Sequence, residues 1–364
     1  MRIAVAVALA IAGTASSASA YPQFQLSRDQ TCAHCHVSPA GGGLLKENGL
    51  ETASTMAMLS TAPEFFYDKV PTPSWLQLGG DARTIYGYVR APQQYLVWLP
   101  MQFDVYASAT FAKQFRAHVT AGFRPAQYEN EAATRVWSRE HYLTWQQDPG
   151  QNEGLYVRAG RFMPVFGLRL VEHPLYARRF GGTPLYAETY GVAVEYITSA
   201  FEVHATGFIK DPFIDPVVHD NGGALYGEYR VTNKVSVGAE AMATSSSDDS
   251  KYRGGVTAKY FLEAADVLVQ AEGQFVRQHI GSFAQSAVLG QLMVTKFLPA
   301  NLMADLALGH YDPNVRVKGL GRDAVDLALH YFLDSHTEIL LLSGVEVLDG
   351  PTAGHALMQL HYRL

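Results

Sequence analysis

Apolar and polar residues alternate along most of the chain after residue 74, and this period of two limits the possible folds more than any other feature. In residues 201–210, apolar side chains occupy the odd positions, and polar ones occupy most even positions, as at Glu202, His204 and Thr206. Residues 234–243 and 266–275 repeat the pattern. Strict alternation over ten residues is typical of β-strands with one apolar and one polar face.

The alternating segments are long, and their connections alternate in length. About sixteen segments of ten to sixteen residues start near residues 79, 97, 115, 133, 154, 188, 200, 222, 234, 251, 266, 283, 300, 321, 336 and 354. Strands of soluble proteins, β-sandwiches included, have about five or six residues. Thr198–Ala200 is a tight turn, whereas residues 164–187 form a long loop. Because outer-membrane barrels combine short periplasmic turns with longer outer loops, the sequence predicts an all-β fold, a transmembrane antiparallel β-barrel of about 16 strands over residues 74–364.

The composition agrees with a barrel and excludes other classes of protein. Only 17% of the 364 residues are charged, against about 25% in an ordinary soluble domain. After residue 16 no apolar run approaches the roughly 20 residues of a membrane helix, which excludes a bundle of such helices. The 48% hydrophobic content excludes intrinsic disorder. The net charge of −6 gives no basic footprint for nucleic acid.

The first twenty residues have the pattern of a secretory signal peptide. A basic start at Arg2 precedes an apolar core over residues 3–12 and a small-residue cleavage site at residues 18–20. A membrane anchor is the alternative, but an apolar core of about ten residues is too short to span a bilayer. We therefore expect residues 1–20 to be removed on export and the mature chain to begin at Tyr21.

The chain has two cysteines, and both lie in the sequence Cys32-Ala33-His34-Cys35-His36. This C-x-x-C-H spacing is the attachment motif of c-type haem. Two thiols three residues apart bind the two vinyl groups of one porphyrin, and the adjacent imidazole becomes the proximal iron ligand. The alternatives are a CxxC redox pair, a structural zinc site and a plain disulfide. The motif, together with export, predicts one covalent haem c held by Cys32, Cys35 and His36.

The second axial position of this haem has several candidates. Met56 and Met58 lie in an apolar, helix-capable stretch of the N-terminal segment, residues 21–73. Either thioether would complete His/Met ligation, which raises the haem potential. Both residues also fit as ordinary core methionines, and a histidine of the barrel wall is a third candidate. His34 is a poor one, because the neighbouring thioethers fix it near the haem edge.

The alternation also assigns charged residues to the barrel lumen. The acidic ones are Glu195, Glu202, Glu228, Glu240, Glu272, Asp305, Asp326, Glu338 and Glu346, and the basic ones are Lys210, Arg230, Lys234, Lys259 and Arg363. Such a lumen either concentrates cations or is a routine polar lining of paired charges. Four histidines have the same orientation, namely His204, His330, His355 and His361.

The loop over residues 164–187 either folds inward or forms an outer docking surface.

The whole architecture resembles the fused outer-membrane cytochrome c–porin family, whose members include the monohaem iron oxidases of iron-oxidising bacteria. The resemblance rests on the signal peptide, on Cys32, Cys35 and His36, and on a remainder of barrel length; residues 154–167 also look like a strand-and-loop stretch common in porins. It implies electron transfer by one haem c in or at an outer-membrane barrel. It also implies an extracellular Fe(II) donor, hence a possible Fe(II) oxidase activity, and a periplasmic carrier such as a soluble cytochrome.

Two functions therefore follow from the sequence. The first is an electron conduit in the outer membrane, with the haem segment on the periplasmic side or inside the lumen. The alternative is a diffusion porin for small solutes, in which a haem-bearing N-terminal segment plugs the pore. An electron cannot cross the apolar band, about 25 Å tall, through lipid, and a barrel of 16 strands is wide enough to admit a plug.

Overall fold

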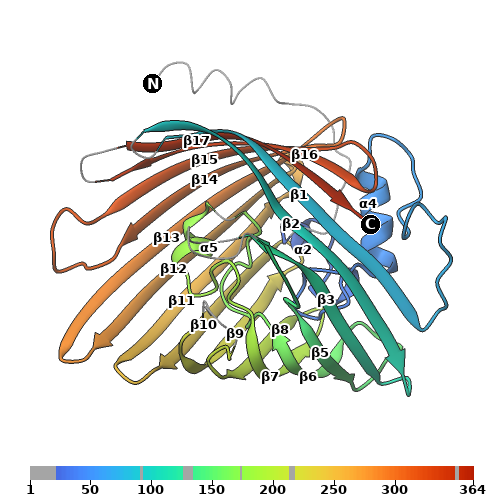
Figure 1. Ribbon diagram of the computed structural model, residues 1–364, viewed down its shortest axis with the longest axis horizontal. Coiled ribbons are helices and arrows are strands. Elements are labelled where there is room, and N and C mark those ends of the chain that lie inside the picture. Colours follow the sequence, from blue (N-terminus) through green and yellow to red (C-terminus); the bar gives the residue numbers. More distant parts are fainter. Residues whose placement is uncertain (1–21, 91–92, 126–133, 173, 213–217, 349–351) are drawn as a thin grey trace.

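The computed structural model describes residues 22–364 except 91–92, 126–133, 173, 213–217 and 349–351. The predicted signal peptide, residues 1–20, lies outside the described residues. Strands dominate the described part, and they form one antiparallel sheet that closes on itself through the pairing of the first strand with the last (Figure 1).

The strands follow one another around the barrel in chain order. They are β1 (Leu76–Arg90), β2 (Gln94–Phe111), β3 (Phe115–Pro125), β4 (Thr134–Trp137), β5 (His141–Gln146), β6 (Gly154–Phe162), β7 (Thr189–Ile197), β8 (Phe201–Phe208), β9 (Asn221–Thr232), β10 (Val235–Ser245), β11 (Asp249–Leu262), β12 (Val267–Ile280), β13 (Phe283–Leu298), β14 (Leu302–Asp312), β15 (Arg322–Phe332), β16 (Thr337–Val347) and β17 (Thr352–Arg363). A short 3-10 helix, η1 (Glu263–Ala265), forms the turn between β11 and β12.

The 17 strand elements of the described residues occupy sixteen positions, because β4 and β5 both pair with β3. They are two halves of one strand that is interrupted at residues 138–140. Closure comes from ten residue pairs between β1 and β17, from Asp81 opposite Arg363 to Arg90 opposite Gly354. The prediction of an antiparallel barrel of about 16 strands is confirmed, and the predicted starts lie within three residues of the observed ones.

The barrel wall is polar inside and apolar outside. On β8, Glu202, His204 and Thr206 are buried, whereas Phe201 and Val203 are 37% and 45% exposed. Elsewhere, large apolar side chains such as Val256 and Leu327 lie open on the exterior. This inverts the arrangement of a soluble domain and matches the lipid-facing exterior and polar interior that the alternation predicts. Among the described residues, no helix is both long and apolar enough to cross a bilayer.

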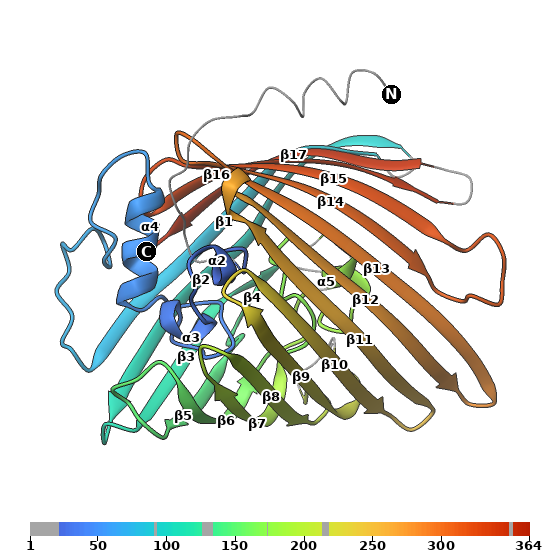
Figure 2. The same ribbon diagram turned by 180° about the vertical axis from the view of Figure 1, so that it is seen from behind.

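The N-terminal segment lies in one end of the barrel (Figure 2). It contains the helices α2 (Phe24–Ser27), α3 (Cys32–Cys35) and α4 (Glu47–Met56). The first two lie within the lumen, and α4 lies at the mouth. From there the chain runs along the β15–β16 turn, where the backbone N–H groups of Met58 and Leu59 donate to the carbonyls of Phe332 and Leu333, both at 3.0 Å. The segment therefore enters from the end that carries the short turns.

The long loop between β6 and β7 folds into the lumen and does not form an outer surface (Figure 1). Its helix α5 (Tyr176–Phe180) packs against the inner faces of β13 and β14. Leu168, Leu175 and Tyr176 of the loop are at most 3% exposed and share one apolar cluster with Met293 and Ala307 of the wall. The lumen is thus occupied from both sides, by the N-terminal segment and by this loop.

The apolar exterior predicts the positions at which a charged substitution lowers the free energy of unfolding. Val256 lies near the middle of β11 and is 63% exposed. We expect Val256→Arg to lower the free energy of unfolding in phospholipid vesicles by about 2–4 kcal/mol, because an arginine near the bilayer midplane loses its hydration. Val317→Arg, in the β14–β15 loop, is the matched control and should cost about 0–1 kcal/mol. Equal costs at both positions in urea titrations would contradict a lipid-facing exterior.

Candidate functional site

The C-x-x-C-H motif forms one helical turn in the lumen. Residues three apart lie on one side of a helix, so α3 directs Cys32 and Cys35 the same way, and both line a common cavity. Ala33 faces the other way, is fully buried, and packs with Tyr156 and Ile197 of the wall. His36 leaves the turn in an extended conformation. The turn thus presents two sulfurs and one imidazole to the cavity and an apolar face to the barrel.

His34 does not line this cavity. Its ring nitrogen Nδ1 lies 2.8 Å from Thr31 Oγ1, so that the side chain folds back on the start of the turn. The sequence prediction that His34 is a poor ligand agrees with this position.

The three glycines after the motif form the rim of the cavity. Backbone hydrogen bonds join Val37 to Leu44 and Lys46 to Cys35, both at 2.9 Å, and they close the loop over residues 38–43. Gly41 has a φ of +90°, and a Cβ there would lie 3.4 Å from Cys32 Sγ. The loop therefore packs its bare backbone against the motif, and only glycine keeps this approach free of side chains.

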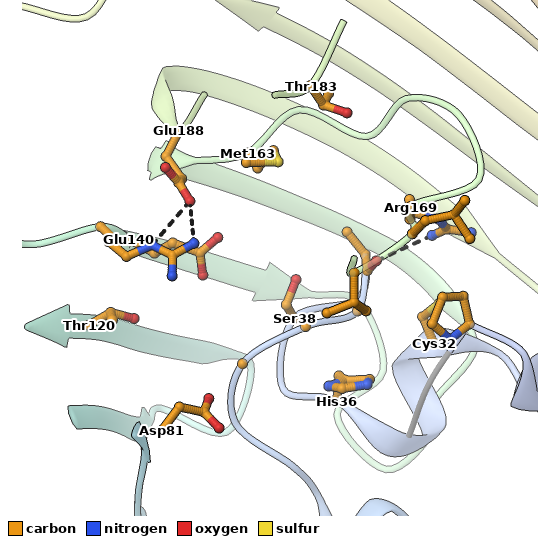
Figure 3. A pocket seen from close by; sticks show the side chains of 18 of the residues that line it. Cys32, His36, Ser38, Asp81, Thr120, Glu140, Met163, Arg169, Thr183 and Glu188 are labelled. Atoms are coloured by element: carbon orange, nitrogen blue, oxygen red, sulfur yellow. Dashed lines mark hydrogen bonds and ion pairs between the residues drawn. The ribbon is translucent and has the colours of Figure 1, made fainter. Parts of the chain in front are cut away.

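The cavity has a volume of about 450 Å³, within the roughly 300–1,000 Å³ of ligand and cofactor sites. Figure 3 shows Cys32, His36 and Arg169 at one end and Glu140 and Glu188 at the other. Its apolar walls come from β2, β3 and the inward loop, and they include Leu99, Met101, Tyr106, Phe123, Met163, Val165, Phe166, Leu170 and Tyr186. The motif therefore opens onto a largely apolar chamber between the N-terminal segment, the loop and the barrel wall.

Buried basic residues fasten the N-terminal segment beside this cavity. Arg158 on β6 donates to Ser38 Oγ at 3.1 Å and to Glu195 Oε1 at 2.9 Å. Arg169 in the loop donates to the Ala40 carbonyl at 3.3 Å and is ion-paired with Glu202. Each guanidinium thus joins the C-x-x-C-H region to an acid of the wall, and a charge-assisted bond of this kind is stronger than a neutral one.

Two more basic side chains of the wall bind the first residues of the N-terminal segment. Lys259 on β11 donates to Gln25 Oε1 at 2.7 Å and to Glu228 Oε2 at 2.6 Å, with both charged side chains at most 2% exposed. Arg230 on β9 donates to Asp29 Oδ1 at 3.0 Å. Because these bonds connect residues some 200 positions apart in the chain, they fix the segment within the barrel.

The interruption between β4 and β5 brings another arginine into the cavity. Arg139 lies in this break and is ion-paired with Glu188 at 2.7 Å and Asp104 at 3.2 Å. A continuous strand would direct residues 138–140 alternately to the two faces of the sheet. The break therefore places one cation where it joins β2 to the end of the inward loop.

Burial keeps the two thiols of the motif protonated. Desolvation raises the pKa of Cys32 and raises the pKa of Cys35 to about 11. The Cys35 thiol donates to Gln30 Oε1 at 3.0 Å. Nearby, desolvation lowers the pKa of Lys46 to about 8, with its ammonium bonded to the Ala33 carbonyl at 2.7 Å.

The structure brings Cys32, Cys35 and His36 together at the cavity but brings neither predicted methionine there. Met56 is 3% exposed and packs between Phe24, Leu268 and Phe332 in the cluster that joins the segment to the wall. Met58 is 55% exposed at the barrel mouth. Met56 thus has the core role that the sequence left open, and neither thioether lies where it would face His36 across the cavity.

The lumen is less acidic than the sequence count suggested. Eight of the nine predicted acids are buried, with Glu346 partly exposed, and Lys259 is buried as predicted. Lys210, however, is exposed, and Lys234 pairs with Glu263 at a turn. The count of lumenal bases from the sequence omitted Arg139, Arg158 and Arg169. Arg139 lies in a strand break and Arg169 in the inward loop, where alternation does not predict the direction of a side chain. The interpretation as a lining of paired charges is the better one.

Four observations test whether these residues fit a haem c. The donor set is two thiols and one imidazole on a single turn. All three residues border one chamber, its volume is in the range of cofactor sites, and Gly41 leaves the space beside Cys32 open. The residues present therefore fit the group that the motif implies.

Neither a family model nor a curated protein matches the chain. Solved structures do match in fold. A loop L8 deletion mutant of OmpT, an outer membrane protein of Vibrio cholerae, has a TM-score of 0.60 at 15% identity over 79% of this chain and 99% of that one. An anion-selective porin from Comamonas acidovorans has a TM-score of 0.61 at 12% identity, with the same coverage. Salmonella typhi OmpF in complex with daunomycin has a TM-score of 0.58 at 10% identity over 79% and 97%. At these identities the likeness shows the porin-type barrel fold.

The attachment of the segment can be tested at Lys259. We expect Lys259→Met to lower the free energy of unfolding by about 3–5 kcal/mol, because it leaves the buried Glu228 carboxylate unpaired. The double variant Lys259→Met/Glu228→Gln should recover part of this loss. Limited proteolysis would report release of residues 22–56 alongside urea titration. A Lys259→Met protein as stable as the parent would contradict an ionic attachment.

The buried thiols predict a pH dependence for haem-free protein. Since only the thiolate reacts with iodoacetamide, alkylation of Cys35 in a Cys32→Ser variant should stay slow near pH 8 and rise only at higher pH, because burial raises the pKa of this thiol. The same variant unfolded in urea is the control, and its rate should follow an ordinary cysteine pKa of about 8.5. Matching profiles for folded and unfolded protein would show that the thiol is not buried.

Proposed function

We propose that the chain is an outer-membrane barrel that carries one covalent haem c in its lumen and transfers electrons between the two sides of the membrane. The observation that carries the proposal is the position of Cys32, Cys35 and His36 on the wall of one chamber of about 450 Å³. The polar interior and apolar exterior support membrane insertion. The C-x-x-C-H spacing supports the cofactor.

The residues around the chamber would hold and shield the group. The thiols of Cys32 and Cys35 would form its two thioether links, and His36 would be the proximal ligand. When bound, the haem supplies one-electron redox chemistry. The apolar chamber walls and the inward loop would reduce the exposure of the group to water, and solvent exposure is one of the features by which a protein sets a haem potential.

Access from the two ends of the barrel differs. The end with the short turns receives the N-terminal segment, so that the motif lies on the side where the chain enters (Figure 2). A soluble cytochrome in the periplasm would exchange electrons there. A one-electron donor such as Fe(II) would act from the end with the long loops. The donor and the carrier follow from the resemblance to cytochrome–porin fusions, since the paired charges of the lumen give no separate support for cation capture.

The comparisons favour a second candidate, a diffusion porin with a haem-bearing plug. The solved structures that match include an anion-selective porin, and the barrel of this chain has the same fold. The lumen of this chain, however, contains both the N-terminal segment and the loop over residues 163–188. Solutes would therefore have to pass around these segments or displace them, and conductance separates the two candidates.

The haem is tested by staining the purified, denatured full-length protein. We expect one covalent haem per chain in the parent and none in the Cys32→Ser/Cys35→Ser variant. His36→Gln should retain covalent haem with an altered absorption spectrum, because it removes the axial ligand and leaves the thioethers. His34→Gln is the matched control and should leave both properties unchanged. A parent protein without covalent haem would end the proposal.

Planar-bilayer recordings of the haem-loaded, full-length protein test the second candidate. An electron conduit with an occupied lumen predicts conductance far below that of an open porin of 16 strands. A large and steady ion conductance would favour the diffusion porin instead.

A further inference from the structure

A row of alternating carboxylates and imidazoles crosses the inner face of the barrel next to the haem chamber. Asp81 Oδ1 lies 2.5 Å from His361 Nε2, and His361 Nδ1 lies 3.2 Å from Glu338 Oε2. Glu338 Oε1 lies 2.6 Å from His330 Nδ1, and His330 Nε2 lies 3.0 Å from Asp305 Oδ2. We call these five residues the His–carboxylate relay. They come from five neighbouring strands, in the order β1, β17, β16, β15 and β14.

The two ends of the relay open onto two different cavities. Asp81 lines the large chamber that also contains Cys32 and His36 (Figure 3). At the other end, Asp305 lines a second cavity of about 10 Å³, which has room for about one water molecule. Glu172 of the inward loop borders this second cavity. The relay thus connects the haem chamber to a second, small cavity that Asp305 and Glu172 border.

A further carboxylate of the second cavity lies close to an imidazole outside it. Asp326 borders it and lies 3.5 Å from His355 Nε2, whose side chain is 18% exposed. His355 lies near the start of β17, on the side of the long loops. A route of titratable groups therefore runs from a partly exposed imidazole to the chamber.

The relay has the chemistry that proton transfer requires. Imidazole accepts a proton at one ring nitrogen and releases one from the other. In both relay histidines each nitrogen faces a carboxylate oxygen, so that every step is a move along an existing hydrogen bond. All five residues are buried, at most 8% exposed. Water therefore does not compete with these bonds.

Other charged and titratable groups face the relay from the surrounding elements. The Tyr106 hydroxyl on β2 donates to Asp81 Oδ2 at 2.5 Å, and Arg83 on β1 acts electrostatically on the same carboxylate. At the far end, Thr295 on β13 donates to Asp305 Oδ1 at 2.5 Å. Glu172 of the loop adds a negative charge near His330. The relay proper contains three carboxylates and two imidazoles, so that excess protons have acceptors along its whole length.

We propose that the His–carboxylate relay delivers a proton to the edge of the haem chamber when the chamber gains an electron. The proposal rests on the proposed function, because the electron comes from the external one-electron donor. One added negative charge in a chamber with apolar walls is costly unless it is compensated, and Asp81 is the relay carboxylate on that wall. The relay supplies this compensation from the second cavity.

The transfer balances along the chain. One proton enters at the Asp305 carboxylate and passes to His330 Nε2, while His330 releases the proton on Nδ1 to Glu338. Glu338 passes a proton to His361 Nδ1, and His361 releases the one on Nε2 to Asp81. One proton crosses each of the four hydrogen bonds, from the donor atom to the acceptor atom. The net result is one proton bound at Asp81, on the chamber wall, for one electron gained. No bond other than N–H and O–H forms or breaks.

The pH dependence of the haem midpoint potential tests the relay in the full-length, haem-loaded protein. Spectroelectrochemical titrations between about pH 5 and pH 8, where imidazoles titrate, should show the potential falling with pH. Full coupling of one proton to one electron corresponds to about 59 mV per pH unit. We expect His330→Gln and His361→Gln to reduce the parent slope by at least half, since each removes a proton-binding imidazole of the relay and uncouples the carboxylates on either side of it. His310→Gln is the matched control, because His310 pairs with Asp323 at 2.8 Å on the surface.

The outcomes separate this inference from the proposed function. A haem-loaded parent with a flat profile would overturn the relay and leave electron transfer intact. A sloped parent with an unchanged His330→Gln profile would also overturn it, because Asp81 would then titrate alone, four hydrogen bonds from Asp305. A protein without covalent haem would overturn the proposed function and the inference with it. A reduced slope in both variants, at unchanged haem content, supports the relay.

Discussion

The pairing of charges inside the barrel is the constraint on which the rest of the structure depends. A closed sheet in lipid must turn its apolar residues outward, and the polar residues of the same strands must then face the lumen. Buried charges are stable only when they are paired or hydrogen-bonded. In this chain the partners include the N-terminal segment and the inward loop, through bonds such as Arg158 to Ser38 and Lys259 to Gln25. These bonds therefore fix the N-terminal segment in the lumen and at the same time satisfy charged groups of the wall.

The candidate site is the space that these contacts leave open. The segment, the loop over residues 163–188 and the inner faces of β1 to β3 meet around the chamber, and the glycines at residues 41–43 keep side chains out of one rim. The matching porins share the barrel, at TM-scores near 0.6. In this chain the N-terminal segment and the inward loop lie in the lumen, and they place the C-x-x-C-H turn inside the barrel beside the chamber. The carboxylates and imidazoles of the relay lie on the wall of the same lumen.

Sequence reasoning was most successful where the physics is local. Alternation located the strands closely, because each strand must show one face to lipid and one to the lumen whatever its neighbours are. It also assigned His204, His330 and His361 to the lumen, and all three are buried there. It was less successful for Arg139 and Arg169, which lie in a strand break and in a loop. The alternation of a strand does not extend to such residues. The orientation of their side chains depends on the path that the chain takes in the folded protein.

The sequence by itself determined the barrel, the approximate strand number, the polar lumen and the C-x-x-C-H turn, since each depends on residues within about ten positions of one another. The tertiary structure decided the direction of the long loop, the ionic attachment of the N-terminal segment and the core position of Met56. It also decided that His330 and His361 share Glu338 between them. The fold also joins residues far apart in the chain, such as Asp81 and His361, which lie 280 positions apart. Only the closure of the sheet, which brings β17 beside β1, puts these two side chains within hydrogen-bond distance.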